Sequence, residues 1–65
     1  MNWDIAKGKW TEIKGSARER WGELTEDDLD EAQGEREQLV GKIQTKYGKT
    51  KAEAEREVED FIASL

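Results

Sequence analysis

Two similar stretches decide the fold of this chain: residues 20–28 read RWGELTEDD, and residues 46–55 read KYGKTKAEAE. In each, an aromatic residue is followed directly by a glycine, and a threonine followed by acidic residues comes two or three positions later. Glycine ends helices readily because it adopts the left-handed conformation without a Cβ penalty. Threonine begins helices because its hydroxyl accepts a hydrogen bond from a free backbone N–H. Each stretch is therefore predicted to be a corner between two helices.

The first corner can be assigned residue by residue. We expect Gly22 to end one helix and Thr25 to begin the next, with Asp28 completing a capping box three residues later. Leu24 and Leu29 flank this cap at the positions of a hydrophobic staple. The sequence thus predicts both the end of one helix and the entry of the chain into its neighbour.

The second corner belongs to a repeat of the first. There, Gly48 is expected to end a helix, and Thr50 with Glu53 to begin another. The six glycines fall into two trios with a spacing of seven residues, and the second trio follows the first by 26 residues: Gly8, Gly15 and Gly22, then Gly34, Gly41 and Gly48. We predict one domain over residues 1–65, with halves of about 3–33 and 34–64.

Apolar residues recur at intervals of three and four, which is the period of an amphipathic helix. One stripe contains Trp3, Ala6, Trp10, Ile13, Ala17 and Trp21; a second, interrupted by Arg36, contains Leu29, Ala32, Leu39, Val40, Ile43 and Tyr47; a third contains Ala54, Val58, Phe61, Ile62 and Leu65. The pattern predicts an all-α fold of four short helices, arranged as two α-hairpins with a break near Gly34.

Charge follows the same division of the chain. Residues 1–22 carry a net charge of +2, residues 23–35 of −7, residues 36–51 of +4, and residues 52–65 of −4. Each half is thus a basic segment followed by an acidic one, which favours the packing of successive helices. Exposed pairs of this kind contribute only about 0.2–1 kcal/mol each, so the apolar stripes remain the main source of stability.

Three glycines do not occupy predicted caps: Gly8, Gly15 and Gly41. A glycine inside a helix costs about 1 kcal/mol relative to alanine. One interpretation is a tolerated weakness or a helix break at these positions, and this is the one we favour. The alternative is a second contact face, where the backbone comes close to another helix or to a partner.

Catalysis is not expected. The chain has no histidine and no cysteine, which removes the commonest proton shuttle and metal ligand together with thiolate chemistry. The dense carboxylates Asp27, Asp28, Asp30 and Glu31 fit a solvated helix face. They lack the glycine-turn loop of a calcium site. We expect no enzyme activity, no metal site and no cofactor.

Nucleic-acid binding is the alternative function that the basic residues suggest. Binding would need a basic surface, formed here by Lys7, Lys14, Arg18, Lys42, Lys46, Lys49 and Lys51. The net charge of −5 and the pI near 4.7 argue against it, as does the position of the tryptophans on the apolar stripe. We expect a monomer in the cytoplasm with no membrane contact, because no apolar run is long enough to span one.

The quoted residues place the chain beside a known family. The segments GKWTEIKGSARERWGELTEDDL (8–29) and GEREQLVGKIQTKYGKTKAEAEREV (34–58) resemble the CsbD-like family of small bacterial proteins over about residues 3–60. The resemblance implies a stress-associated protein of unestablished molecular function, without catalytic residues. It also implies a SAM-like arrangement of two roughly orthogonal α-hairpins, a group of folds that includes helix-hairpin-helix modules, and through this the nucleic-acid-binding alternative. Two modes of action stay open, an interaction module with a macromolecular partner and a hydrophilic protectant.

Overall fold

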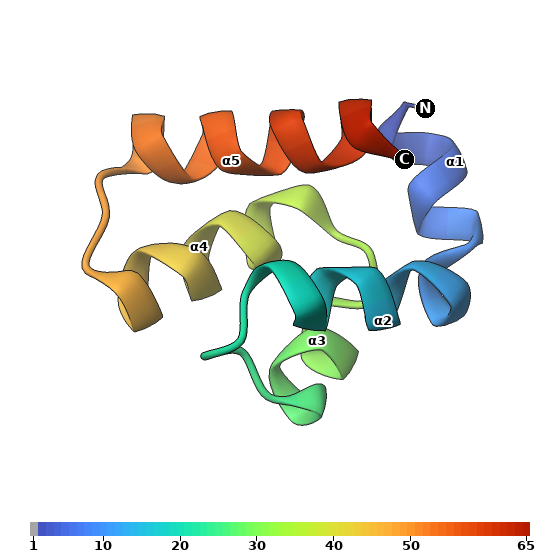
Figure 1. Ribbon diagram of the computed structural model, residues 1–65, viewed down its shortest axis with the longest axis horizontal. Helices are drawn as coiled ribbons and strands as arrows, with labels where there is room; N and C mark the ends of the chain where they lie inside the picture. The colour runs from blue at the N-terminus through green and yellow to red at the C-terminus, as the bar shows by residue number, and fades with distance from the viewer. Residues whose placement is uncertain (1) are drawn as a thin grey trace.

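The computed structural model describes residues 2–65, which form five helices (Figure 1). No strand occurs within this range, so the prediction of an all-α fold is confirmed. The helices are α1 (Trp3–Gly8), α2 (Trp10–Arg20), α3 (Glu26–Ala32), α4 (Arg36–Tyr47) and α5 (Lys51–Ser64).

The structure has one helix more than the four predicted, because the first stripe is divided at Lys9. This residue adopts φ −111° and ψ 22°, and its N–H lies 3.1 Å from the carbonyl of Ile5 and 3.2 Å from that of Ala6. The preceding Gly8 weakens the helix at this point, and α1 turns steeply away from α2 (Figure 1). The turn leaves Ala6 fully buried.

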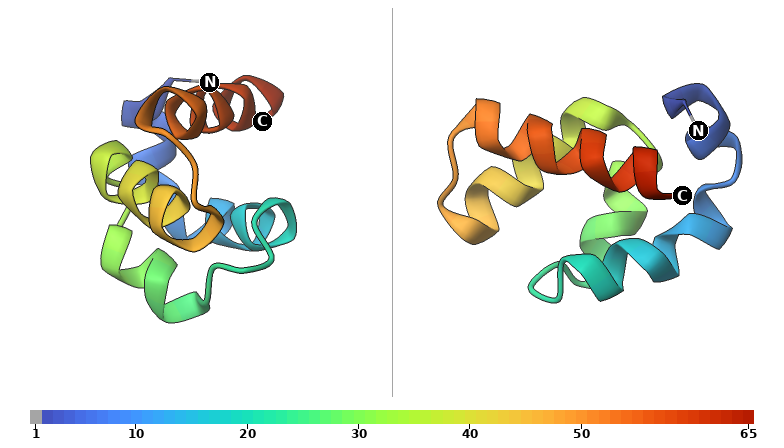
Figure 2. Two further views of the ribbon diagram at one scale, coloured as in Figure 1. Left: turned by 90° about the vertical axis from the view of Figure 1, so that its left-hand side faces the viewer. Right: turned by 45° about the horizontal axis from the view of Figure 1, so that its top comes forward.

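Each helix packs chiefly on the one that follows it in the chain, and the α4–α5 hairpin is the most extensive of these contacts. Helices α4 and α5 lie side by side in Figures 1 and 2, with α2 and α3 packed beneath α4. The corner after α2 and the corner after α4 join successive helices, as predicted. The roughly orthogonal crossing of the two hairpins, the SAM-like arrangement and the repeat of two halves stay predictions.

The core is built from the three predicted stripes. Trp21 is only 2% exposed, and its ring packs edge-on against Phe61 with 4.9 Å between the ring centroids. Trp3 and Tyr47 are partly buried against the same cluster. Leu65 departs from the prediction, since it is 40% exposed at the end of the third stripe. The apolar periodicity therefore identified the core except for Leu24, which is buried in the first corner outside the three stripes, and it wrongly included Leu65.

The caps confirm most of the corner assignments. Thr25 with Asp28 and Thr50 with Glu53 both form complete capping boxes. Gly48 ends α4 in the left-handed conformation, with φ 64° and ψ 35°. Helix α2 ends next to Gly22 as predicted, but the left-handed conformation predicted for this glycine is wrong.

Helix α2 ends at Arg20, and its C-cap residue Trp21 has φ −119° and ψ 79°, which is neither helical nor left-handed. Among the glycines of residues 2–65, only Gly34 and Gly48 have positive φ. The buried indole fixes the end of the helix here, and the left-handed glycine cap is not used.

Gly34 is required by a close approach of α1. It adopts φ +78°, and a Cβ at this position would lie 2.9 Å from the Cα of Lys7. By contrast, a Cβ at Gly8, Gly15 or Gly41 would meet nothing within 4 Å. These three glycines make no close helix contact within the described chain, which agrees with the interpretation of a tolerated weakness. Contact with a partner at this face stays a prediction.

Candidate functional site

The most organised polar feature is a set of ion pairs that holds α3 between α2 and α4. From α2, the Nζ of Lys14 lies 2.8 Å from a carboxylate oxygen of Asp30. From α4, the Nζ atoms of Lys42 and Lys46 lie 3.7 Å and 3.3 Å from the two carboxylate oxygens of Asp28. The acidic helix is thus paired on both sides, as the alternation of charge along the sequence predicts.

Asp28 is the centre of this set. Its side chain is only 16% exposed, and its Oδ2 accepts a hydrogen bond from the backbone N–H of Thr25 at 3.0 Å. This hydrogen bond, assisted by Lys46, lowers the pKa of Asp28 from 3.8 to about 2. The carboxylate is therefore ionised at neutral pH and serves as a structural cap.

A second junction connects the two corners with α5. The indole N–H of Trp21 donates to Oε1 of Glu57 at 2.9 Å, and the Nζ of Lys49 lies 2.6 Å from Oε2 of the same carboxylate. Lys49 first, and then Trp21, lower the pKa of Glu57. The hydroxyl of Tyr47 accepts a hydrogen bond from the backbone N–H of Glu23 at 3.0 Å. The aromatic residue of each corner therefore makes a polar contact outside its own helix.

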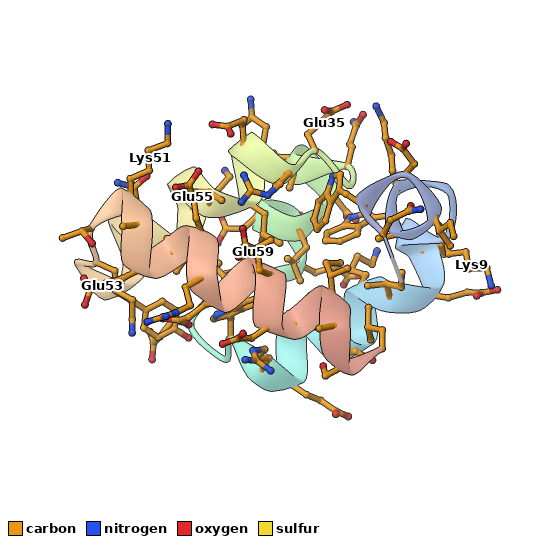
Figure 3. The ribbon with its side chains drawn as sticks, turned by 90° about the horizontal axis from the view of Figure 1, so that it is seen from above. Lys9, Glu35, Lys51, Glu53, Glu55 and Glu59 are labelled. Atoms are coloured by element: carbon orange, nitrogen blue, oxygen red, sulfur yellow. The ribbon has the colours of Figure 1, made fainter. Side chains whose placement is uncertain are left out.

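Arg36 forms a third charged group, at the start of α4. Its guanidinium lies 3.4 Å from carboxylate oxygens of both Glu55 and Glu59, and 3.6 Å from one of Glu37. Figure 3 shows Glu55 and Glu59 on the edge of α5 that faces α4, whereas Glu53 lies on its other edge. Arg36 therefore pairs with three carboxylates, of which Glu37 also pairs with Lys51.

Beside Arg36 lies a mainly apolar groove, with a volume of about 220 Å³. It opens between α1, the first turn of α4 and the last turns of α5, and is lined by Trp3, Arg36, Val58, Glu59, Ile62 and Ala63. The indole N–H of Trp3 is buried and has no hydrogen-bond acceptor within residues 2–65. The indoles of Trp10 and Trp21 are both hydrogen-bonded, so Trp3 is the least anchored of the three.

Comparison with known proteins identifies the family of the chain. A family model described as CsbD-like matches residues 4–56. The chain belongs to the CsbD-like family. Relatives include a UPF0337 protein of Pseudomonas aeruginosa, 56% identical over the full length of both chains, and one of Bordetella pertussis, 52% identical over 95% of this chain and 94% of the relative. The UPF0337 protein YjbJ of Escherichia coli K12 is 52% identical over 94% of this chain and 88% of its own.

No solved structure matches this CsbD-like protein. In residues 2–65, no helix has the length and apolar character needed to cross a membrane.

The family assignment confirms the resemblance drawn from the quoted segments, and the relatives span nearly the whole chain.

The predicted basic residues are distributed over several helix junctions. Most are paired with carboxylates: Lys7 with Glu35, Lys14 with Glu26 and Asp30, Lys42 with Asp28 and Glu31, Lys46 with Asp28, Lys49 with Glu57, and Lys51 with Glu37. Arg18 makes no ion pair with any of residues 2–65. Lys14, Lys42 and Lys46 converge on α3, whereas Lys7, Lys49 and Lys51 pair at other junctions. A phosphate would have to compete with these carboxylates, and nucleic-acid binding stays a prediction.

The acidic run of α3 has no neighbouring ligands for a metal: no group of three or more residues of the ligating types Asp, Glu, His or Cys is suitably arranged in the described chain. The carboxylates with a shifted pKa are Asp28, Glu53 and Glu57, and in each the pKa is lowered. A general acid at neutral pH needs a raised carboxylate pKa. These three groups are therefore suited to holding charge and not to donating protons.

The groove beside Trp3 was not predicted from the sequence. The available signal was Arg36, a charged residue inside an otherwise apolar stripe. It falls 26 residues after Trp10, so the second half of the chain places a guanidinium where the first half has a buried indole. The position of α1 depends on the break at Lys9, and for this reason the opposite wall of the groove could not be anticipated.

Proposed function

We propose that this CsbD-like protein is a non-catalytic, stress-response protein of the bacterial cytoplasm, acting as a monomeric helical module that binds or protects other macromolecules. Family membership supports the bacterial and stress-associated part of the proposal. The observation that carries the non-catalytic part is the state of the carboxylates. Those with shifted pKa values are held ionised in caps and ion pairs between helices, so their chemistry is committed to the fold.

Of the two modes of action, the structure favours a defined interaction module. Both corners are closed by complete capping boxes, and fifteen apolar residues are buried in one cluster. Such a chain presents a fixed arrangement of side chains, which a partner recognises by shape and charge. A protectant that acts through hydration alone needs no such packing.

The stress-response part is tested by measuring the level of the protein in the bacterium that encodes it. We expect the level to rise on entry into stationary phase and on salt or heat stress, relative to a housekeeping protein. A level that stays constant under all three conditions would contradict the proposal.

The mode of action is tested by comparing folded and unfolded protein in one assay. An aggregation-prone enzyme is heated or dried with wild-type protein, with Trp21→Ala as the unfolding variant, or with Gly22→Ala as the matched folded control. An interaction module requires protection by wild type and Gly22→Ala, and its loss in Trp21→Ala. Equal protection by all three proteins would indicate a protectant that works through composition.

The nucleic-acid alternative is tested with the same preparations. Fluorescence anisotropy of a short labelled DNA duplex is measured with increasing protein at low and at physiological salt. Binding that weakens steeply with salt and is reduced in Arg18→Gln, but unchanged in Arg56→Gln, would favour the alternative. We expect no binding at physiological salt.

A further inference from the structure

We propose that the groove between α1, α4 and α5 binds a polypeptide segment in which a large apolar side chain stands next to a basic residue. This inference rests on the proposed function as an interaction module and names the chemistry of its partner. The apolar side chain would enter beside Trp3 and Ile62, and the basic residue would pair with Glu59 at the rim.

The size and lining of the groove suit one apolar side chain. Its volume of about 220 Å³ exceeds the roughly 150 Å³ of an apolar cavity that accepts benzene, so one leucine or phenylalanine side chain can enter it. Val58, Ile62 and Ala63 form the wall on α5, and Trp3 lies on the opposite side. Covering this surface removes apolar area from water, which is the main favourable term in association.

The rim determines the charge of the partner. Glu37, Glu55 and Glu59 stand around the guanidinium of Arg36, and Lys51 also pairs with Glu37, so three carboxylates face two cations and the rim keeps an excess of negative charge. The side chain of Glu59 is 70% exposed and lies 3.4 Å from Arg36, which leaves it free to turn towards an incoming cation. An anionic ligand would meet uncompensated carboxylates, whereas a lysine or arginine would complete their pairing.

Trp3 adds a second reason to place the site here. Its indole N–H is buried without an acceptor, and such a donor is costly because its hydrogen bond to water has been lost. A backbone carbonyl of an inserted segment can serve as that acceptor after a small rotation of the ring. Trp3 is held by neither of the hydrogen bonds that fix the rings of Trp10 and Trp21.

The experiment is an NMR titration of the isotopically labelled full chain with the blocked peptide acetyl-Lys-Phe-Lys-amide. The three indole N–H signals report separately on Trp3, Trp10 and Trp21. We expect the signal of Trp3 and the amides of Ile62 and Ala63 to shift progressively. Acetyl-Lys-Ala-Lys-amide tests the apolar requirement, and acetyl-Glu-Phe-Glu-amide tests the charge; both should bind much more weakly.

Two pairs of variants locate the site. Ala63→Leu fills the groove and should abolish the shifts, whereas Ala52→Leu, at an exposed position near the other end of α5, should leave them unchanged. Glu59→Gln removes a rim charge and should weaken binding about two- to fivefold, while Asp60→Asn should not. Circular dichroism of each variant verifies that the helices are intact.

Several results would overturn the inference: no shifts at the highest soluble peptide concentration, shifts confined to other surfaces, or equal binding of the acidic peptide. These outcomes would leave the proposed function standing, since the protection assay does not use the groove. Peptide binding at the groove, together with full protection by the unfolding variant, would instead contradict the interaction mode of the proposed function and keep the site.

Discussion

The two corners of this CsbD-like protein start from nearly the same sequence and reach different geometries. At the second corner, Gly48 adopts the left-handed conformation and the chain reaches Thr50 at once. At the first corner, Gly22 has no such conformation, and the helix is capped by the non-helical backbone of Trp21. The longer first connection is closed by a hydrogen bond from the N–H of Leu24 to the carbonyl of Trp21.

The difference shows which part of the motif determines structure. The threonine has the same role at both corners, because its cap depends only on residues three positions away. The role of the glycine depends on the aromatic residue before it. Trp21 is buried against Phe61 and bonded to Glu57, whereas Tyr47 is only partly buried. Tertiary packing therefore decides where the first helix ends.

The largest effect should come from the aromatic residue of the first corner. Trp21→Ala should lower the free energy of unfolding by about 3–5 kcal/mol, because it removes a buried indole and leaves a cavity. Urea denaturation followed by circular dichroism measures this change. Tyr47→Ala at the second corner should cost clearly less. An unchanged melting temperature in Trp21→Ala would contradict its place in the core.

The next largest effect on stability should come from Gly48, and Gly22 should differ from it. Gly48→Ala should destabilise by about 1–2 kcal/mol, since an L-residue is strained in the left-handed conformation. Gly22→Ala should be neutral within about 0.5 kcal/mol, because no positive φ is required there and a Cβ would meet nothing within 4 Å. Thermal denaturation of both variants side by side measures the two losses of stability. Equal losses would mean that the two corners use glycine in the same way.

The threonines should behave alike. Thr25→Ala and Thr50→Ala should each cost about 1 kcal/mol through loss of the cap, as measured by urea unfolding. Serine at either position keeps the hydroxyl and should restore most of the stability. If only one of the two alanine variants is destabilised, the equivalence of the caps is wrong.

The smallest effect should appear only in acid. The folded-state pKa of Asp28 is about 2, below its ordinary value of 3.8, so its stabilisation is complete above about pH 4 and is lost as the pH falls towards 2. Asp28→Asn should therefore flatten the dependence of the urea midpoint on pH in this window. Glu53→Gln, at the other corner, serves as the matched variant and should flatten it less, because Glu53 lacks the ion pair that Lys46 gives to Asp28.

The sequence was sufficient to predict the features that depend on near neighbours. The all-α class, the capping boxes, the left-handed Gly48 and nearly all core positions follow from spacings of three and four residues. Leu65 and Gly22 were assigned incorrectly, because burial at a helix end and the path of a loop depend on distant packing. The break at Lys9 had a local signal in Gly8, but the contact of Lys7 with Gly34 had none.

The features of the candidate site also separate into those that the sequence predicts and those that depend on distant packing. Alternating charge predicted that basic helices would pair with acidic ones, and Lys14, Lys42 and Lys46 do so on α3. The groove beside Trp3 brings α1 at one end of the chain together with α4 and α5 in its second half. No spacing within one helix encodes this contact. Arg36, a charged residue in an apolar stripe, indicated the wall of the groove on α4 but not that Trp3 forms the opposite wall.

The packing of each helix chiefly on its successor has a kinetic consequence. Contacts between segments that are near in sequence require little loop closure, and helical domains of this kind fold in microseconds to milliseconds. The chain also contains no proline, so no slow prolyl isomerisation delays the return to the native state. A protein of this design regains its structure almost as soon as denaturing conditions end, well before larger proteins around it have refolded.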